Sequence, residues 1–209
     1  FALVSWARRG VSETGVNPFA SYGTPKKGDF LYKDLNGDGV IDDNDKYAVG
    51  HGLAPRLTYG FSLGAEWNGF DFSCLFQRNA GLQVYWQDKF YMGYINYGDV
   101  INKEIAEGAW REGRTNATYP RLLTGLNTLN AQPSDFWVQN KSYLRLKNVQ
   151  IGYKIPKKLL QKLDISQLRL YTSLENMLTF TSYKGIDPEI SGTTYPTMKQ
   201  ITVGVNVVF

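Results

Sequence analysis

The residues whose types and spacing could bind a ligand lie in one acidic stretch between positions 34 and 45. Side-chain oxygens occur there at the first, third, fifth, ninth and twelfth positions, and the seventh position offers a backbone carbonyl. This spacing matches the twelve-residue EF-hand-like calcium loop, in which alternate oxygens surround one hard cation and Gly39, at position six, permits the sharp turn. The sequence therefore predicts a calcium site with these ligands: Asp34, Asn36, Asp38, Val40, Asp42 and Asp45.

The surroundings of the loop favour a structural calcium site over a calcium sensor. The flanking segments 30–33 and 47–50 look extended and lack the amphipathic helices of a sensor. Position 12 is Asp45 where the pattern has Glu, and the shorter side chain reduces the reach of that carboxylate. The alternative is a metal-free Asp/Asn/Gly turn, although the four ligand carboxylates would repel one another without a cation.

No other residues form a pattern with clear catalytic potential. Asp187 and Glu189 are a carboxylate pair in a loop, but no base, nucleophile or oxyanion-stabilising group accompanies them. The single cysteine, Cys74, excludes an intrachain disulfide, and the single histidine, His51, argues against a histidine metal cluster or a Ser-His-Asp triad. The net charge of +4 is spread without a basic run. We therefore expect neither an enzyme nor a nucleic-acid-binding protein.

The elements that must position these residues read as long antiparallel strands. Apolar residues alternate with small or polar ones over residues 57–67 and again over 70–77. Asn68-Gly69 between them is a strong hairpin signal, because both residues tolerate the positive φ of a type I′ turn. The same alternation recurs in three further segments: 143–155, 168–175 and 201–209.

Short and long connections alternate between these strands. The short ones are the turn at 68–69 and a segment at 156–163 that is expected to form one or two helical turns. The long ones are 79–135, with a helix expected near 100–110, and 181–198. Outer-membrane barrels have short periplasmic turns, long extracellular loops, and strands of about 9–11 residues with alternating apolar and polar faces. Compact soluble sandwiches rarely contain such long loops.

The sequence therefore predicts an all-β fold with two regions. Residues 1–55 form an irregular segment that carries the calcium-type loop at 34–45. Residues 56–209 supply C-terminal antiparallel strands and extracellular loops of a large transmembrane β-barrel. About five or six strands are readable, fewer than the roughly eight that close a barrel. No run of about 18 apolar residues occurs, so no transmembrane helix is expected.

Several motifs in the same order resemble the SusC/RagA family of TonB-linked outer-membrane transporters, and the last strand, ending at Phe209, is similar to the C-terminal signal strand of outer-membrane barrels. The motifs include Gly28-Asp-Phe-Leu-Tyr-Lys-Asp-Leu-Asn-Gly-Asp-Gly-Val-Ile-Asp42, Ser142-Tyr-Leu-Arg-Leu-Lys-Asn-Val-Gln-Ile-Gly-Tyr153, Tyr183-Lys-Gly-Ile-Asp-Pro-Glu189 and Gly204-Val-Asn-Val-Val-Phe209.

The resemblance implies part of a TonB-dependent nutrient importer in the bacterial outer membrane. Such an importer contacts membrane lipid, pairs with a SusD-like surface lipoprotein and takes up an oligosaccharide or peptide. Contact with TonB would pass through an N-terminal plug that is absent from this chain. Loop aromatics could touch substrate or partner, or pack within the loops or at the membrane interface: Tyr85, Trp86, Phe90, Tyr91, Tyr94, Tyr97 and Trp110.

The alternative is a soluble, calcium-stabilised, β-rich module that binds carbohydrate or another protein. Such a module would refold as a monomer in buffer without detergent. Isolated barrel strands would instead aggregate or need detergent, because their lipid face and strand edges would be exposed.

Overall fold

The chain divides into two compact units, each made of two separate stretches of sequence. In the computed structural model, one unit comprises Phe1–Gly52 and Val84–Gln139, and the other comprises Leu53–Gln83 and Asn140–Phe209. The structure describes residues 2–4, 8–9, 23–48, 50, 52, 54–86, 94–95, 100–114, 116–124, 129–161, 164–190 and 194–209.

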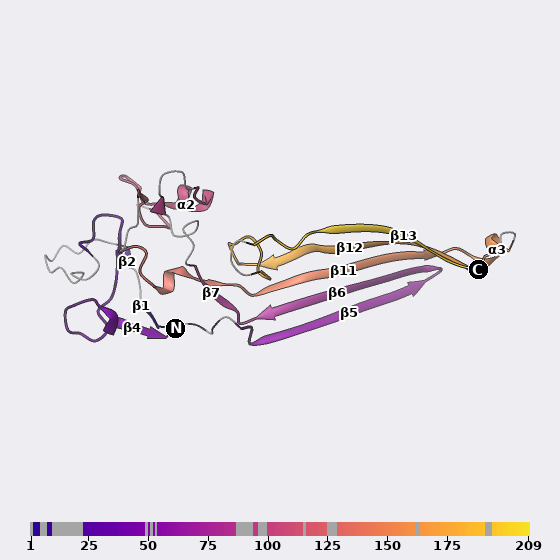
Figure 1. Cartoon of the computed structure of the whole chain (residues 1–209), viewed down its shortest axis with the longest axis horizontal. Coiled ribbons are helices and arrows are strands. Elements are labelled where there is room, and N and C mark those ends of the chain that lie inside the picture. The colour runs from indigo at the N-terminus through magenta and orange to yellow at the C-terminus, as the bar shows by residue number, and fades with distance from the viewer. Residues whose placement is uncertain are drawn as a thin grey trace. The chain divides into compact units, whose positions relative to one another are not determined.

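The second unit is built around a five-stranded antiparallel sheet (Figure 1). Its strands are β5 Leu57–Trp67, β6 Phe70–Ala80, β11 Tyr143–Lys154, β12 Gln167–Thr181 and β13 Gln200–Val208. The order across the sheet is β13-β12-β11-β6-β5. All five predicted strands are present and antiparallel, which confirms the all-β prediction, and the described residues form an open sheet and not a closed barrel.

The two short connections of this sheet have the predicted character. Asn68 and Gly69 have φ values of 47° and 86°, as a type I′ turn requires, and Trp67 pairs with Phe70 directly before it. Between β11 and β12, α3 (Lys157–Leu160) forms one helical turn. Both connections are tight because the strands they join are neighbours in the sheet.

A bulge in the middle of the sheet changes the register of β11. Leu146 pairs with Phe76 and Asn148 with Leu75, so Lys147 is an extra residue without a partner in β6. A bulge of this kind re-aims a side chain and locally interrupts the alternation. On the side of β11 away from β6, β12 extends to Thr181, beyond the predicted end at residue 175. The strand includes Asn176, whose φ is 53°.

The first unit contains only short elements in its described part. They are β1 Ala2–Val4, β2 Arg8–Arg9, β3 Phe30–Leu31, a 3-10 turn at Asp43–Asp45, β4 Lys46–Ala48, β8 Tyr94–Ile95, α2 Lys103–Gly108, β9 Leu123–Thr124 and a 3-10 turn at Asp135–Trp137. β1 pairs with β4, β2 with β3 and β8 with β9; β7 Gln83–Tyr85 pairs with β10 Val138–Asn140. The helix α2 lies where the sequence predicts one.

An aromatic cluster forms the core of the first unit. The ring of Phe30 lies 4.7 Å from that of Phe136, centroid to centroid, and Phe136 contacts the fully buried Trp137 edge to face at 4.8 Å. Beside them the buried Asp29 accepts two hydrogen bonds from the Arg121 guanidinium, at 2.6 and 2.9 Å. The segment predicted as a long loop is therefore packed against the segment around residue 30. Among the described residues, neither helix is long and apolar enough to cross a membrane.

Candidate functional site

The five-stranded sheet has one apolar and one polar face. Register places one row of apolar residues across all five strands, and the next row, pointing to the other face, is small or polar. The apolar row is Leu63, Cys74, Val149, Leu174 and Ile201. The polar row is Gly64, Ser73, Gln150, Ser173 and Thr202.

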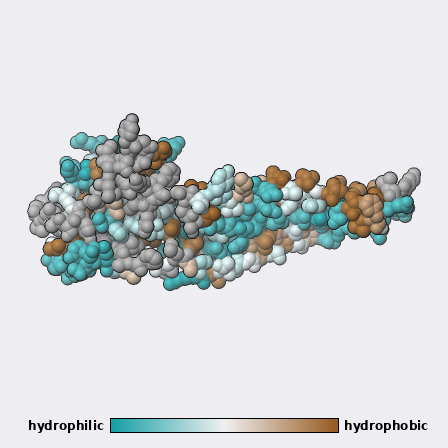
Figure 2. Space-filling model, viewed as in Figure 1, coloured by the Kyte–Doolittle hydropathy of each residue, from teal (hydrophilic) through white to brown (hydrophobic). Residues whose placement is uncertain are grey.

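The apolar face is largely uncovered. Leu63 is 58% exposed, Ile201 64% and Val203 77%, and Figure 2 shows apolar side chains at the surface along the sheet. A soluble monomer rarely exposes a contiguous apolar patch of more than a few hundred Å². The polar face is therefore the side suited to water and solutes, and the apolar face the side suited to hydrocarbon.

An ion pair crosses the polar face near the Asn68-Gly69 turn. Arg169 of β12 donates to both carboxylate oxygens of Asp71 in β6, at 2.9 and 2.5 Å. The two residues reach across β11 at Gly152, where a Cβ would lie 2.5 Å from Asp71 Oδ1 and 2.6 Å from Arg169 Nε. The missing side chain at position 152 thus makes room for a bidentate pair between strands that are not neighbours.

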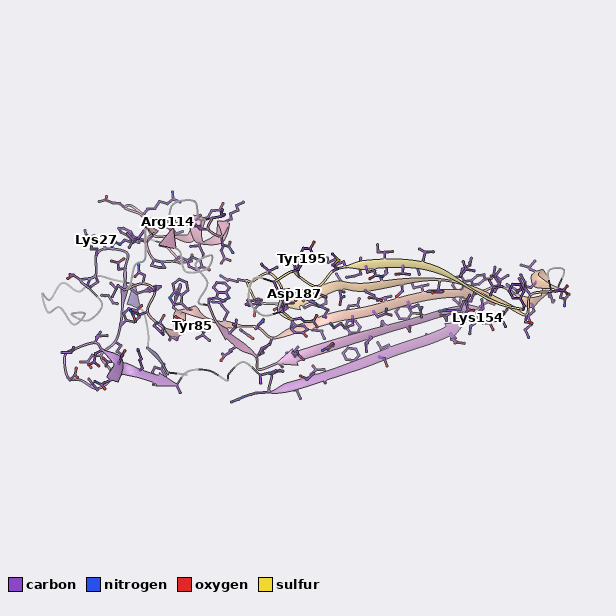
Figure 3. The ribbon with its side chains drawn as sticks, in the orientation of Figure 1. Lys27, Tyr85, Arg114, Lys154, Asp187 and Tyr195 are labelled. Carbon is purple, nitrogen blue, oxygen red and sulfur yellow. The ribbon has the colours of Figure 1, made fainter. Side chains whose placement is uncertain are left out.

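A second charged cluster lies at the opposite end of the sheet, where the loop after β12 returns to the polar face. Figure 3 shows Asp187 at this end and Lys154 near the other. Arg145 of β11 donates to Asp187 at 2.8 Å and also to Glu189. Glu189 further accepts from the Tyr143 hydroxyl at 2.8 Å and pairs with Lys147 at 2.5 Å. The arrangement neutralises both carboxylates within a mostly buried site.

The hydrogen bonds decide the ionisation of the two carboxyls. Burial alone raises the pKa of Asp187, but donation from the Glu189 N–H, the Arg145 guanidinium and the Thr197 N–H outweighs it, so its pKa lies below the ordinary value. Burial likewise opposes ionisation of Glu189, and bonds from Lys147 and Tyr143 bring its pKa below the ordinary value. Burial lowers the pKa of Lys141, partly offset by the charge of Asp187.

The predicted calcium ligands all lie in one continuous loop in the first unit. Asp34 accepts the N–H groups of Gly37 and Gly39, at 2.6 and 2.8 Å, and Asp38 accepts that of Val40 at 2.8 Å. These bonds curl the loop, with Gly39 at a φ of 81°.

At the end of the loop, Asp45 is fully buried and accepts the N–H groups of Leu35 and Asp42, at 2.7 and 2.9 Å. Ile41 is 2% exposed and anchors the loop. Among the residues that the structure describes, no three His, Cys, Asp or Glu side chains gather in an arrangement that would hold a metal ion. Calcium binding by Asp34, Asn36, Asp38, Val40, Asp42 and Asp45 stays a prediction.

Known proteins with similar sequence and structure show what the chain resembles. The chain is 31% identical over 203 residues to TonB-dependent receptor P3 of Formosa agariphila, covering 90% of this chain and 20% of that protein. It is 27% identical over 192 residues to TonB-dependent receptor SusC of Bacteroides thetaiotaomicron, covering 86% of this chain and 17% of that protein. Its fold matches the RagAB peptide importer in the 'open-open' state with a TM-score of 0.70 and 26% identity, covering 100% of this chain and 22% of that one. Over most of its length, the chain is similar to part of the TonB-dependent receptors, SusC among them, and to part of the RagAB peptide importer.

These similarities confirm the resemblance that the motifs indicate. The chain spans about one fifth of the length of the curated relatives that it matches. No protein-family model matches it. The open antiparallel sheet is what a portion of a SusC/RagA-type barrel is expected to form.

Sequence reasoning found the carboxylates of the charged cluster but missed their partners. Asp187 and Glu189 stand out in the sequence, whereas Arg145 and Lys147 do not, because isolated basic residues in a strand are common. The useful signal was the alternate spacing of Tyr143, Arg145 and Lys147 on one face of a strand otherwise rich in leucine.

The loop aromatics named above are only partly described. Trp86 is 4% exposed and belongs to the packed interior of its unit, while Tyr85 and Trp110 are half-buried. Tyr94 lies in β8, and nothing is described of its side chain. His51, Phe90, Tyr91 and Tyr97 lie outside the described residues.

Proposed function

We propose that this chain forms part of the barrel wall of an outer-membrane, TonB-dependent nutrient importer. The observation that carries the proposal is the pair of adjacent rows across the sheet, one apolar and on a largely exposed face, the other small and polar. In a membrane the apolar row faces lipid and the polar row faces a wet lumen. Closure would require further strands of the same receptor on both sides of the sheet.

The wider role follows from the relatives. We propose that the parent receptor imports an oligosaccharide or peptide together with a SusD-like surface lipoprotein, and that TonB acts on it through a plug outside this chain. The similarity to SusC and to the RagAB peptide importer supports this role. A transport role without catalysis also agrees with Asp187 and Glu189, whose carboxylates are engaged by Arg145 and its neighbours.

Cysteine labelling at two adjacent positions tests the barrel proposal. In the full receptor carrying Cys74→Ser, the variant Ser62→Cys places a thiol on the polar face, and Leu63→Cys places one on the apolar face. A membrane-impermeant maleimide added to purified outer membranes should label position 62 and spare position 63, because a thiolate does not form in hydrocarbon. Both variants should label equally after the receptor is unfolded, which controls for reactivity.

Equal labelling of the two positions in the membrane would contradict the proposal. It would favour the alternative, a soluble calcium-stabilised β-rich module that binds carbohydrate or protein.

We also propose that the loop at 34–45 holds a structural calcium ion. Oxygen donors at alternate positions support this, as do the burial of Asp45 and Ile41, which fixes both ends of the second half of the loop. Calcium would stabilise the first unit by binding the folded state only. The ligands would be the side chains of Asp34, Asn36, Asp38, Asp42 and Asp45 and the carbonyl of Val40.

Calcium titration of the full receptor checks this. The midpoint of thermal unfolding should rise with calcium in the parent and not in Asp34→Ala/Asp38→Ala, because that variant lacks two of the ligands. Asp43→Ala removes an exposed carboxylate of the same loop that is not a predicted ligand, and it should keep the response. The same dependence of the unfolding midpoint on calcium in the parent and the double variant would contradict the proposed calcium site.

A further inference from the structure

The loop that follows β12 is held against the polar face of the sheet by a row of side chains two residues apart. Lys141, Tyr143, Arg145 and Lys147 alternate along β11 and the residues directly before it. Each of them contacts the described loop segment 183–190. One face of β11, extended by Lys141 directly before it, therefore supplies the anchors in this row.

The anchors contact both ends of the segment 183–190 and Asp187 within it. Lys141 Nζ donates to the carbonyl of Ile190 and lies 5.7 Å from the ring centroid of Tyr183. Arg145 holds Asp187 at 2.8 Å and also bonds Glu189, while its Nε donates to Thr179 at 2.9 Å. The guanidinium thus joins the loop to β12 as well as to its own strand.

The bulge in β11 contributes the last anchor. Lys147 is the extra residue of the bulge relative to β6, and a bulge changes the direction of a side chain. The Lys147 ammonium pairs with Glu189 at 2.5 Å. Tyr143 donates to the same carboxylate at 2.8 Å. Tyr143 and Lys147, which flank Arg145 in the sequence, therefore bind the same carboxylate of Glu189 as Arg145 does.

Burial makes these contacts costly to separate. Arg145 is 3% exposed, Asp187 5% and Lys141 6%. Moving the loop away would leave the arginine without its carboxylates in a poorly solvated position. Asp187 also accepts the Thr197 N–H at 3.0 Å, which fixes the chain on its way back to β13.

We propose that residues 183–190 are a fixed part of the lumen wall, clamped by Lys141, Tyr143, Arg145 and Lys147, and not a gate that swings when substrate binds. The placement in a lumen rests on the proposed function, whereas the clamp itself does not. The clamp acts on the shape of the pore at this end of the sheet, so its four anchors are positioning residues and do not need to touch substrate.

Hydrogen exchange of the full receptor in detergent tests the clamp. The Glu189 and Thr197 amides, which donate to Asp187 at 2.8 and 3.0 Å, should be protected in the parent and should exchange at least about tenfold faster in Arg145→Gln, which removes the charge and the guanidinium donors. Arg145→Lys should restore part of the protection. Arg169→Gln breaks the comparable pair at the other end of the sheet and should leave these amides unchanged.

A second variant keeps the test decisive if Arg145→Gln does not fold. Asp187→Asn/Glu189→Gln alters only the loop side and should expose the same amides. Loss of protection on acidification is a further readout. Because both carboxyls have lowered pKa values, the clamp should persist at neutral and mildly acidic pH and open only as the pH falls through those values.

Unchanged protection in the variants, or rapid exchange of the Glu189 and Thr197 amides in the parent, would overturn the clamp. Either result would leave the cysteine labelling at positions 62 and 63 as it was, so failure of the clamp and failure of the barrel proposal are distinguishable.

Discussion

At the scale of single residues, one glycine determines how closely two segments of the first unit approach. The carbonyl of Gly28 accepts the Arg121 N–H at 2.9 Å, and its φ is 87°. A Cβ on Gly28 would fall 2.5 and 2.9 Å from carbon atoms of the Trp110 indole. The contact needs both a left-handed backbone and an absent side chain, and it lies beside the ion pair of buried Asp29 and half-buried Arg121.

Gly28→Ala should therefore destabilise the first unit more than the same substitution at a glycine of similar φ. Gly113 has a φ of 80° and open space around its Cα, so Gly113→Ala should cost only the strain of about 1–2 kcal/mol. Gly28→Ala should cost roughly 1–3 kcal/mol more, since the rigid indole must move. Hydrogen exchange of the amides near residues 121 and 130 in the full receptor measures the local opening. Equal effects of the two substitutions would show that the indole contact is unimportant.

At the scale of elements, the β5–β6 hairpin joins local turn chemistry to its position beside β11. Asn68 and Gly69 supply the two positive φ values of the turn, and the carbonyl of Gly69 accepts the Lys154 N–H at 2.7 Å. A Cβ on Gly69 would come within 3.0 Å of the Lys154 carbonyl, which is backbone and cannot easily move. The turn thus fixes the end of the neighbouring strand as well as its own register.

Gly69→Ala should weaken the hairpin by about 1–2 kcal/mol through left-handed strain, with the backbone contact adding to it. Asn68→Gly retains the required φ at the first turn position and should change the free energy of unfolding by only a few tenths of a kcal/mol. Denaturant unfolding of the receptor in detergent compares the two. A larger loss in Asn68→Gly than in Gly69→Ala would contradict the assignment of the strained position.

At the scale of the whole chain, the units are assembled from segments far apart in sequence. The sequence divides naturally near residue 55, where regular alternation begins. In the structure, the stretch 84–139 clusters with 1–52, and the strands on either side of it meet as β6 and β11. The stretch 84–139 therefore contributes Phe136 and Trp137 to a packed core, because the rings of both residues lie against Phe30.

The sequence by itself determined the features that depend on neighbours along the chain. The strands, their apolar and polar faces, the Asn68-Gly69 turn, α3 and the EF-hand-like spacing at 34–45 all follow from two-residue periodicity or local turn chemistry. Only the tertiary structure decided that β11 lies between β6 and β12, that Lys147 occupies a bulge, and that Arg145 meets Asp187. These depend on the register between distant segments and on which buried charges come together, and no short-range pattern of residues encodes either one.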